Sequence, residues 1–572
     1  MAIKSEKIQA YLELGISAHQ TGNLKDAEKN YRRVLKINHM NPDALNLLGV
    51  ISFQNGAPIK AKTLIKKAIQ YYSKNAGYYN NLGQALQDLG EIEEAILTYK
   101  LALELSPNDP DILNNLGLSF SSIDRFEDAQ SIYEDALSIT KTDPQIFHNF
   151  GVMLQESGQL HAAIGSYKKA LELNPDFPEV HASLASALEE SGDRGLAIIS
   201  YFKAIKIAPL YIEAHIGLKK IRWASKDIEN LDESFYYACK VCPNSIEAHH
   251  NLANALLETG KIEAASLAIN KALSISKSNA ETFNLLAKIH KVQKNYNEAI
   301  IAQKQSIKLD CQNPFYRENL GETLCISKQF EEAIKELLIA HKINPRRSGV
   351  LGSLIIAMNE THDPRIKNFV DYGKWVTTRT INIPGGFSSL RDFNEALHSE
   401  IADRHDKSPP PMDQTMHGGT QIPNNLFKSP SGLTALIKNQ ITTELTQYIK
   451  SLDQDSTHPF LCYKNINFKY TGAWSTILYD EGYDSNHIHN EGWLSGVYYI
   501  KVPDLPDKIW ENGQGCIQFG EPPSLFLSQQ NKTCRLIRPE EGCVVFFPSY
   551  YWHGVRPFKE KGLRHAIAFD II

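Results

Sequence analysis

The sequence lacks several features that would place the protein in a specialised class. It contains no run of eighteen apolar residues, so no segment is suited to cross a bilayer as a helix. Its first residues, MAIKSEKIQAYLEL, lack the apolar stretch of a signal peptide. The formal net charge is only −5, which gives no bulk attraction to nucleic acid or to an anionic membrane. These absences predict a protein with neither nucleic acid nor membrane among its partners.

Cysteine is also scarce, with eight residues scattered over 572 positions. Cys239 and Cys242 form a CxxC pair, but no second pair accompanies it to complete a zinc site, so we interpret it as ordinary packing. No disulfide framework is suggested, which favours a reducing, cytoplasmic location. The length itself predicts more than one domain.

A repeat of 34 residues runs through the first part of the chain. One column of small residues consists of Gly15, Gly49, Gly83, Gly117, Gly151, Ala185, Ala253, Ala287 and Gly321, with Lys219 as the exception. Seven residues later lies a column of Gly22, Gly56, Gly90, Asp124, Gly158, Gly192, Lys226, Gly260, Lys294 and Lys328. Twelve residues after the first column lies a column of Ala27, Ala61, Ala95, Ala129, Ala163, Ala197, Ala265, Ala299 and Ala333, with Leu231 as the exception.

The three columns predict a pair of antiparallel helices in each repeat. Small residues in the first and third columns let the two helices cross closely, and the second column suits the turn between them. The period and these positions resemble the tetratricopeptide repeat, which implies an all-α solenoid of about ten repeats over residues 1–345. We expect a local irregularity in the repeat that contains Lys219 and Leu231.

An asparagine column precedes the first glycine column by two residues. Its members are Asn81, Asn115, Asn149, Asn251 and Asn319. A carboxamide can donate to and accept from a peptide backbone of any sequence. The column resembles the asparagine ladder of protein O-GlcNAc transferases, which implies a protein or peptide partner in the groove. The alternative is that these are surface asparagines in contact with solvent alone.

The helical period fades after Pro345. We expect residues 346–386 to form capping helices and a linker, including a helix-like segment from Arg365 to Thr378. Residues 387–572 then form a separate domain with one predicted helix, Gly432 to Leu452. Its β-branched and aromatic segments predict strands at 475–479, 494–500, 515–519, 533–537, 543–547 and 564–569. Many short strands favour a double-stranded β-helix, or jelly roll.

Four residues of this domain form a candidate metal centre. His487 and His489 share one face of an extended strand because they are two residues apart. His553 follows at a distance, and Arg564 comes eleven residues after it. Two close ligands, a distant histidine and a basic residue are the layout of a non-haem iron site beside an anion-binding cation.

The motifs Tyr479-x-x-Gly482-x-x-x-x-His487-x-His489, Gly515 to Phe519 and Pro539-Glu-Glu-Gly542, with the distal His553, resemble those of prolyl-hydroxylase-type 2-oxoglutarate/Fe(II)-dependent dioxygenases. Within that group the variants that carry HxH are most similar. The resemblance implies Fe(II), 2-oxoglutarate and O2 as cofactor and cosubstrates, with Arg564 on the distal carboxylate of 2-oxoglutarate. It also makes Tyr479 and Tyr498 candidates for contact with the cosubstrate, although both could be core aromatics. Arg556 is the alternative anion partner.

The sequence departs from the family where His489 stands in place of the usual carboxylate ligand. Three possibilities remain open: a site of His487, His489 and His553; a site in which Glu491 supplies the carboxylate; and a domain that binds no iron. The sequence therefore predicts a dioxygenase that hydroxylates a protein or peptide bound by the repeats. The alternatives are a small-molecule hydroxylase whose repeats recruit a partner, and a non-catalytic scaffold with a cupin-like binding domain.

Overall fold

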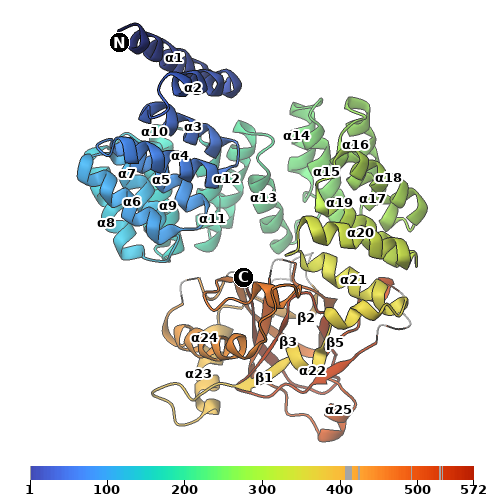
Figure 1. Cartoon of the computed structure of the whole chain (residues 1–572). Coiled ribbons are helices and arrows are strands. Elements are labelled where there is room, and N and C mark those ends of the chain that lie inside the picture. Colours follow the sequence, from blue (N-terminus) through green and yellow to red (C-terminus); the bar gives the residue numbers. More distant parts are fainter. Residues whose placement is uncertain are drawn as a thin grey trace. The chain divides into compact units, whose positions relative to one another are not determined.

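The computed structural model describes residues 2–405, 415–422, 425–428, 430–490, 492–526, 530 and 532–572. The chain divides into two compact units, Met1–Gly217 and Leu218–Ile572, and the boundary falls within helix α13. Both units are shown in Figure 1. Among the described residues, no helix combines the length and the apolar character needed to cross a membrane.

The first unit is a helical repeat array, as the three columns predict. Its helices are α1 (Ala2–Gln20), α2 (Leu24–Ile37), α3 (Pro42–Gln54), α4 (Pro58–Tyr71), α5 (Ala76–Asp88), α6 (Ile92–Leu105), α7 (Pro110–Ser121), α8 (Phe126–Ile139), α9 (Pro144–Glu156), α10 (Leu160–Leu173), α11 (Pro178–Glu190), α12 (Arg194–Ile207) and the start of α13 (Ile212–Ala224).

The array of helices continues in the second unit. Its members there are α14 (Glu233–Val241), α15 (Ile246–Glu258), α16 (Ile262–Ile275), α17 (Ala280–Val292), α18 (Tyr296–Leu309), α19 (Pro314–Ile326), α20 (Phe330–Ile343) and α21 (Ser348–Glu360). The irregularity expected near Lys219 is seen as the short helix α14, of nine residues. Lys219 itself is buried and bonds to Glu258 at 2.6 Å.

Prolines and asparagines explain where the helices start. Pro42 and Pro314 occupy the first turn of their helices, where a missing N–H costs no hydrogen bond. The preceding residues, Asn41 and Asn313, accept a hydrogen bond from a backbone N–H of the first turn. Helix starts are therefore fixed locally by the sequence at the repeat boundaries.

The second column forms the turns within the helix pairs. All ten of its residues have a positive φ, from 59° at Asp124 to 92° at Gly192. This left-handed conformation ends one helix and redirects the chain, and glycine adopts it at the least cost. The column also includes Lys226, Lys294 and Lys328, where an ordinary side chain bears the strain.

The first and third columns lie where helices cross. A Cβ built on Gly83 would lie 2.4 Å from the Tyr99 ring, and one built on Gly151 would lie 2.6 Å from the Tyr167 ring. The alanines of the third column are completely buried. A larger residue at these positions would force the helices apart, which explains the period.

The segment that was expected to form capping helices and a linker contains other secondary-structure elements as well. It contains α21, the 3-10 turn η1 (Pro364–Asn368), the short helix α22 (Tyr372–Trp375) and the strand β1 (Thr377–Thr380). The helix-like segment expected over Arg365–Thr378 is therefore wrong: it contains only part of η1 and the four-residue α22, and its last two residues belong to β1, which pairs with β7. The β-branched threonines of β1 suit a strand. The buried residues of α19 to α21 form one hydrophobic core with those of the sheet.

The C-terminal part is a curled antiparallel half-barrel, consistent with the predicted jelly roll (Figure 1). Its remaining strands are β2 (Met416–Gln421), β3 (Tyr470–His487), β4 (Leu494–Lys501), β5 (Ile517–Phe519), β6 (Arg535–Ile537), β7 (Cys543–Pro548), β8 (His553–Val555) and β9 (Arg564–Ile571). The strand order is β1-β7-β4-β9-β3-β8-β5-β6, and β2 also pairs with β3.

Helices cover the sheet of this domain. They are α23 (Leu390–Ala402) and α24 (Gly432–Ser451), with α25 (Asp507–Glu511) and two 3-10 turns, η2 (Leu461–Tyr463) and η3 (Ser524–Phe526). Tyr448 of α24 stacks on Phe546 of β7, with ring centroids 5.4 Å apart, and its hydroxyl donates to the Trp375 carbonyl. Asn394 of α23 bonds to β4 through Tyr498. The helices thus close one face and leave the interior of the curled sheet for a pocket.

Candidate metal centre

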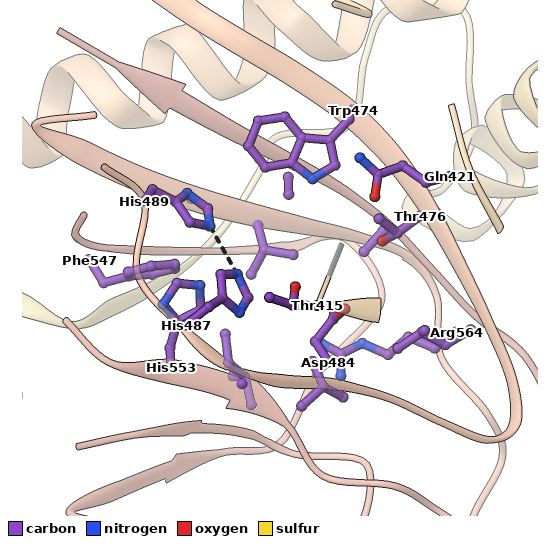
Figure 2. Close-up of a pocket in the computed structure, with 18 residues that line it drawn as sticks. Thr415, Gln421, Trp474, Thr476, Asp484, His487, His489, Phe547, His553 and Arg564 are labelled. Atoms are coloured by element: carbon purple, nitrogen blue, oxygen red, sulfur yellow. Dashed lines mark hydrogen bonds between the residues drawn. The ribbon is translucent and has the colours of Figure 1, made fainter. Parts of the chain in front are cut away.

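The structure brings the three predicted histidines together at one end of a pocket (Figure 2). His487 ends β3 and lies opposite His553 of β8 in the antiparallel register. His489 follows two residues after the strand, and its Nε2 lies 3.2 Å from Nε2 of His487. One nitrogen from each ring lies within 4.8 Å of the other two, close enough to bind one ion.

Hydrogen bonds fix the orientation of all three rings. Nδ1 of His487 donates to the Ser485 carbonyl at 2.8 Å, and Nδ1 of His553 donates to the Tyr551 carbonyl at 2.9 Å. Nδ1 of His489 lies 2.6 Å from Oδ1 of Asp570. Because carbonyl and carboxylate oxygens only accept, each Nδ1 carries the proton and each Nε2 keeps its lone pair. The three Nε2 atoms are therefore available as metal ligands.

Burial favours the neutral form of two of these imidazoles, those of His487 and His553. Burial lowers the pKa of His487 to about 4, and the neighbouring His489 adds to this effect. Burial also lowers the pKa of His553 well below its usual value, with His487 and His489 contributing further. A neutral imidazole is the form that binds a metal ion, so the site needs little deprotonation before binding.

Arg564 lies on the other side of the same pocket (Figure 2). It starts β9, and only 3% of the residue is exposed. Its guanidinium donates to the Gly515 carbonyl at 3.2 Å and to the Tyr499 hydroxyl at 3.0 Å, and it lies 4.8 Å from the centre of the Tyr499 ring. These contacts hold the guanidinium in place and leave donors for an anion.

The walls between the two ends are mixed in character. Trp474, Phe547 and Val497 provide apolar surface, and polar side chains include those of Thr415 and Gln421 (Figure 2). Hydrophobic walls with a few polar groups are usual for a site that binds a small organic molecule.

The carboxyl group of Asp484 also lines the pocket. Burial raises the pKa of this carboxyl, while the nearby Arg564 acts in the opposite direction. A carboxyl group beside a cation was not predicted from the sequence, since nothing in the motif separates Asp484 from the polar residues around it.

The two tyrosines proposed as cosubstrate contacts lie outside the pocket lining. Tyr479 is 47% exposed, and Tyr498 points to α23, where its hydroxyl donates to Oδ1 of Asn394 at 2.6 Å. Adjacent residues of a strand face opposite sides, so it is Tyr499 that contacts Arg564. Contact of Tyr479 or Tyr498 with the cosubstrate stays a prediction, and neither side chain lines this pocket.

The two alternative site residues have different outcomes. Glu491 lies outside the described residues, so the structure does not place it. Arg556 donates from Nε to Gln518 at 2.7 Å and from a terminal nitrogen to Thr533 at 3.0 Å, and it is not part of the pocket lining. Arg564 is therefore the arginine that faces the pocket.

The asparagine column is half-buried and bonded between repeats. Nδ2 of Asn81, Asn115 and Asn149, in the first unit, donates to Asn46, Asn80 and Asn114 of the preceding repeat at 2.9–3.1 Å. In the second unit Asn319 bonds to Asn284 in the same way at 2.8 Å, and Asn251 occupies the equivalent place on α15. This inter-repeat role was not predicted from the sequence.

Comparison with known families matches both parts of the chain. Residues 472–570 match the family described as "Putative 2OG-Fe(II) oxygenase". Tetratricopeptide-repeat families match residues 86–123, 112–147, 151–192, 246–279 and 280–313. Residues 20–102 match the family of subunit 3 of the anaphase-promoting complex.

Two individual relatives are similar to the repeats. The type IV pilus assembly protein PilF of Pseudomonas aeruginosa is 33% identical over 92 residues, which are 16% of this chain and 36% of that protein. The chain thus spans about a third of the length of this curated relative. A solved structure of Pseudomonas aeruginosa PilF has 23% identity, covers 37% of this chain and 96% of its own, and has a TM-score of 0.33. A TPR protein of Thermus thermophilus has 25% identity, covers 32% and 99%, and has a TM-score of 0.29.

The family matches agree with the architecture described above. The repeat matches fall on helix pairs, and the oxygenase match covers β3 to β9, which carry the three histidines and Arg564. The chain is therefore a tetratricopeptide repeat array joined to a C-terminal domain of the family described as "Putative 2OG-Fe(II) oxygenase".

Proposed function

We propose that the chain is a 2-oxoglutarate- and Fe(II)-dependent dioxygenase that hydroxylates a protein or peptide recruited by its repeats. The observation that carries the proposal is the pocket, which has three histidine nitrogens close enough to hold one ion at one end and a buried, oriented arginine at the other. An ion and a dicarboxylate are the two ligands that such an arrangement suits.

The residues present fit the metal. Three imidazoles whose Nδ1 atoms are hydrogen-bonded to oxygens, with Nε2 left as the ligand atom, form a donor set that Fe(II) accepts, as do other first-row ions. His487, His489 and His553 would hold the ion. Bound Fe(II) and 2-oxoglutarate would supply O2 activation, in which the 2-oxo acid yields succinate and CO2 and the substrate C–H becomes C–OH.

The chain's own residues bind and orient the reactants. Arg564 would pair with the distal carboxylate of 2-oxoglutarate, and its bonds to Gly515 and Tyr499 fix it before the cosubstrate arrives. Trp474 and Phe547 line the pocket with apolar surface, which would disfavour water beside the bound cosubstrate. Preorganisation of this kind lowers the entropy lost on binding.

The repeats supply the argument for a macromolecular substrate. Tetratricopeptide arrays generally bind proteins, and the asparagine column places carboxamides at the same position of successive repeats. One N–H of each amide is used between repeats in four of the five cases, and a carboxamide has a second N–H for a peptide carbonyl.

The test measures succinate formed by the full-length chain with Fe(II), O2 and 2-oxoglutarate. Protein extract and its low-molecular-mass filtrate are added separately. The proposal predicts that the protein fraction stimulates turnover, that trypsin digestion to small fragments reduces the effect, and that His553→Ala abolishes it. Stimulation by the filtrate alone would indicate a small-molecule hydroxylase. No succinate and no bound iron under any condition would leave a non-catalytic scaffold.

A further inference from the structure

The departure of the site from the family pattern has a counterpart in the residues behind it. Where the dioxygenase motif has a carboxylate ligand, this chain has His489, which brings no negative charge to the ion. An ion held by three neutral imidazoles keeps one more unit of positive charge than an ion held by two imidazoles and a carboxylate. In a buried pocket that extra charge opposes binding of the ion.

Asp570 supplies a negative charge directly behind His489. Its Oδ1 lies 2.6 Å from Nδ1 of His489, and the residue is only 8% exposed. Within the described part of the chain, no lysine or arginine lies in ion-pair range of Asp570. The carboxylate is therefore directed at the imidazole ring and is not neutralised by another cation.

Ser495 holds Asp570 in this position, and Ser549 contacts Ser495. The Ser495 hydroxyl donates to Oδ1 of Asp570 at 2.5 Å, and it lies 2.8 Å from the Ser549 hydroxyl. The strands fix the geometry, because Ser495 of β4 and Asp570 of β9 are directly opposite in the antiparallel register. The network is thus built into the centre of the sheet.

The other two histidines are bonded differently. Nδ1 of His487 and Nδ1 of His553 both donate to backbone carbonyls, which carry no charge. Only the histidine that replaces the carboxylate ligand is backed by a carboxylate. The charged partner of Nδ1 is therefore found at the same histidine that replaces the carboxylate ligand. A backbone carbonyl would be enough to orient the ring, so orientation alone does not require a buried charge there.

From this geometry we infer that Asp570 is a positioning residue that restores, through His489, the negative charge lost from the first ligand sphere. A carboxylate bonded to Nδ1 makes Nε2 a stronger donor and fixes its tautomer. The inference rests on the proposed metal site. It adds that His489 and Asp570 act together as one ligand, in which the negative charge lies on the far side of the imidazole ring from the ion.

The first test is a titration of the full-length chain with Co(II) alone, without oxygen, followed by its visible absorption. Asp570→Asn keeps the size of the side chain and removes its charge. We expect the affinity for Co(II) to fall about 10- to 100-fold and the visible spectrum at saturation to shift. Ser549→Ala, which changes the network but leaves the charge, is the matched control and should bind Co(II) nearly as tightly as the wild type.

A double-variant cycle separates charge from structure. In His489→Asp the family ligand is restored, and Asp570 becomes a second anion beside it. Adding Asp570→Asn to that variant should leave the affinity unchanged or raise it, which reverses the sign of its effect. A loss of similar size in both backgrounds would overturn the inference, because it would show that Asp570 only supports the fold.

A further pair of variants applies if His489→Asp does not fold, as judged by its melting temperature without metal. Asp570→Glu keeps the charge and changes the shape, whereas Asp570→Asn does the reverse. The inference predicts tighter Co(II) binding by Asp570→Glu, and tighter binding by Asp570→Asn would refute it. Wild-type affinity and spectrum in Asp570→Asn would also refute it while leaving the metal site intact. Failure of the wild-type chain to bind any Co(II) or Fe(II) would instead overturn the proposed function and the inference with it.

Discussion

Arg564 provides the sharpest test of where the cosubstrate binds. The substitution Arg564→Lys keeps a positive charge in the pocket but removes the planar fork that can bind a carboxylate through two N–H groups. It also removes a donor from the Gly515 carbonyl or from the Tyr499 hydroxyl, since an ammonium at the end of a flexible stem cannot reproduce both bonds. The perturbation therefore affects anion binding more than net charge.

The size of the effect follows from the number of hydrogen bonds lost. A hydrogen bond to a charged group contributes about 1.5–3 kcal/mol, and about 1.4 kcal/mol corresponds to a tenfold change in Kd. Loss of one of the two bonds to the distal carboxylate should therefore weaken 2-oxoglutarate binding about 10- to 100-fold. Binding of 2-oxobutanoate, which lacks that carboxylate, should change much less.

The assay is calorimetric titration of the Fe(II)-loaded, full-length chain with each 2-oxo acid in the absence of oxygen. Arg556→Lys is the matched control, because Arg556 is bonded to Gln518 and Thr533 outside the pocket lining. The reasoning would be refuted if Arg556→Lys weakened 2-oxoglutarate binding and Arg564→Lys did not. Equal losses for both acids in Arg564→Lys would show that the substitution disturbs the pocket and not the carboxylate contact.

Three further predictions concern the fold. A fragment of residues 218–572 should fold, whereas a fragment of residues 387–572 should be unstable because it lacks β1 and α21. Thermal melting of the two fragments tests this, and equal melting temperatures would contradict the hydrophobic core that α21 shares with the sheet. In the array, Gly151→Ala should destabilise by about 1–3 kcal/mol through overpacking, while Gly165→Ala, with no neighbour within 4 Å, should be neutral or stabilising in urea denaturation; the reverse order would contradict the crossing geometry. Burial, with His398 and His405 nearby, lowers the pKa of His565 to about 3. Its contribution to the free energy of unfolding is therefore complete above the pKa of the unfolded chain, about 6.5, and is lost as the pH falls from there toward 3. His565→Gln should reduce the dependence of unfolding free energy on pH by up to about 1.4 kcal/mol per pH unit in that range, and an unchanged slope would contradict the assignment.

The repeat array was predicted well from the sequence because each repeat needs the same residue types at its helix crossing and at its turn. Positions such as Gly83 and Gly151 are set by close contact with an aromatic ring sixteen residues later. The turn column is visible because glycine is the least strained residue at positive φ. Helix α24 was also predicted within one residue of its C-terminal end, since its period and its flanks are local features.

The strands were predicted less completely, for reasons that depend on tertiary contacts. β8 has only three residues and carries His553, so no run of β-branched residues marks it. β1 has only four residues, TTRT, and its place in the sheet is set by pairing with β7. β2 contains Gly418 and Gly419 and pairs with β3 around an irregularity in register.

The grouping of the three histidines and Arg564 around one pocket could be predicted because their spacing in sequence reflects the sheet directly. The residues behind them could not. Asp570 reaches His489 only because β4 and β9 are neighbours, and it lies 81 positions away in the sequence. The contact of Tyr499 with Arg564 was also not predicted, because the face of β4 that each residue occupies is fixed by strand pairing and not by the composition of the strand.

The central claim is that His487, His489 and His553 hold an iron ion beside a 2-oxoglutarate site. It is tested most directly by anaerobic titration of the full-length chain with Fe(II), with and without 2-oxoglutarate, followed by visible charge-transfer absorption. The account predicts one Fe(II) per chain and a band that requires 2-oxoglutarate, is lost in His489→Ala and remains in Glu491→Ala. A band lost in Glu491→Ala would assign the third ligand to that carboxylate, and the absence of stoichiometric iron in the unmutated chain would contradict the account.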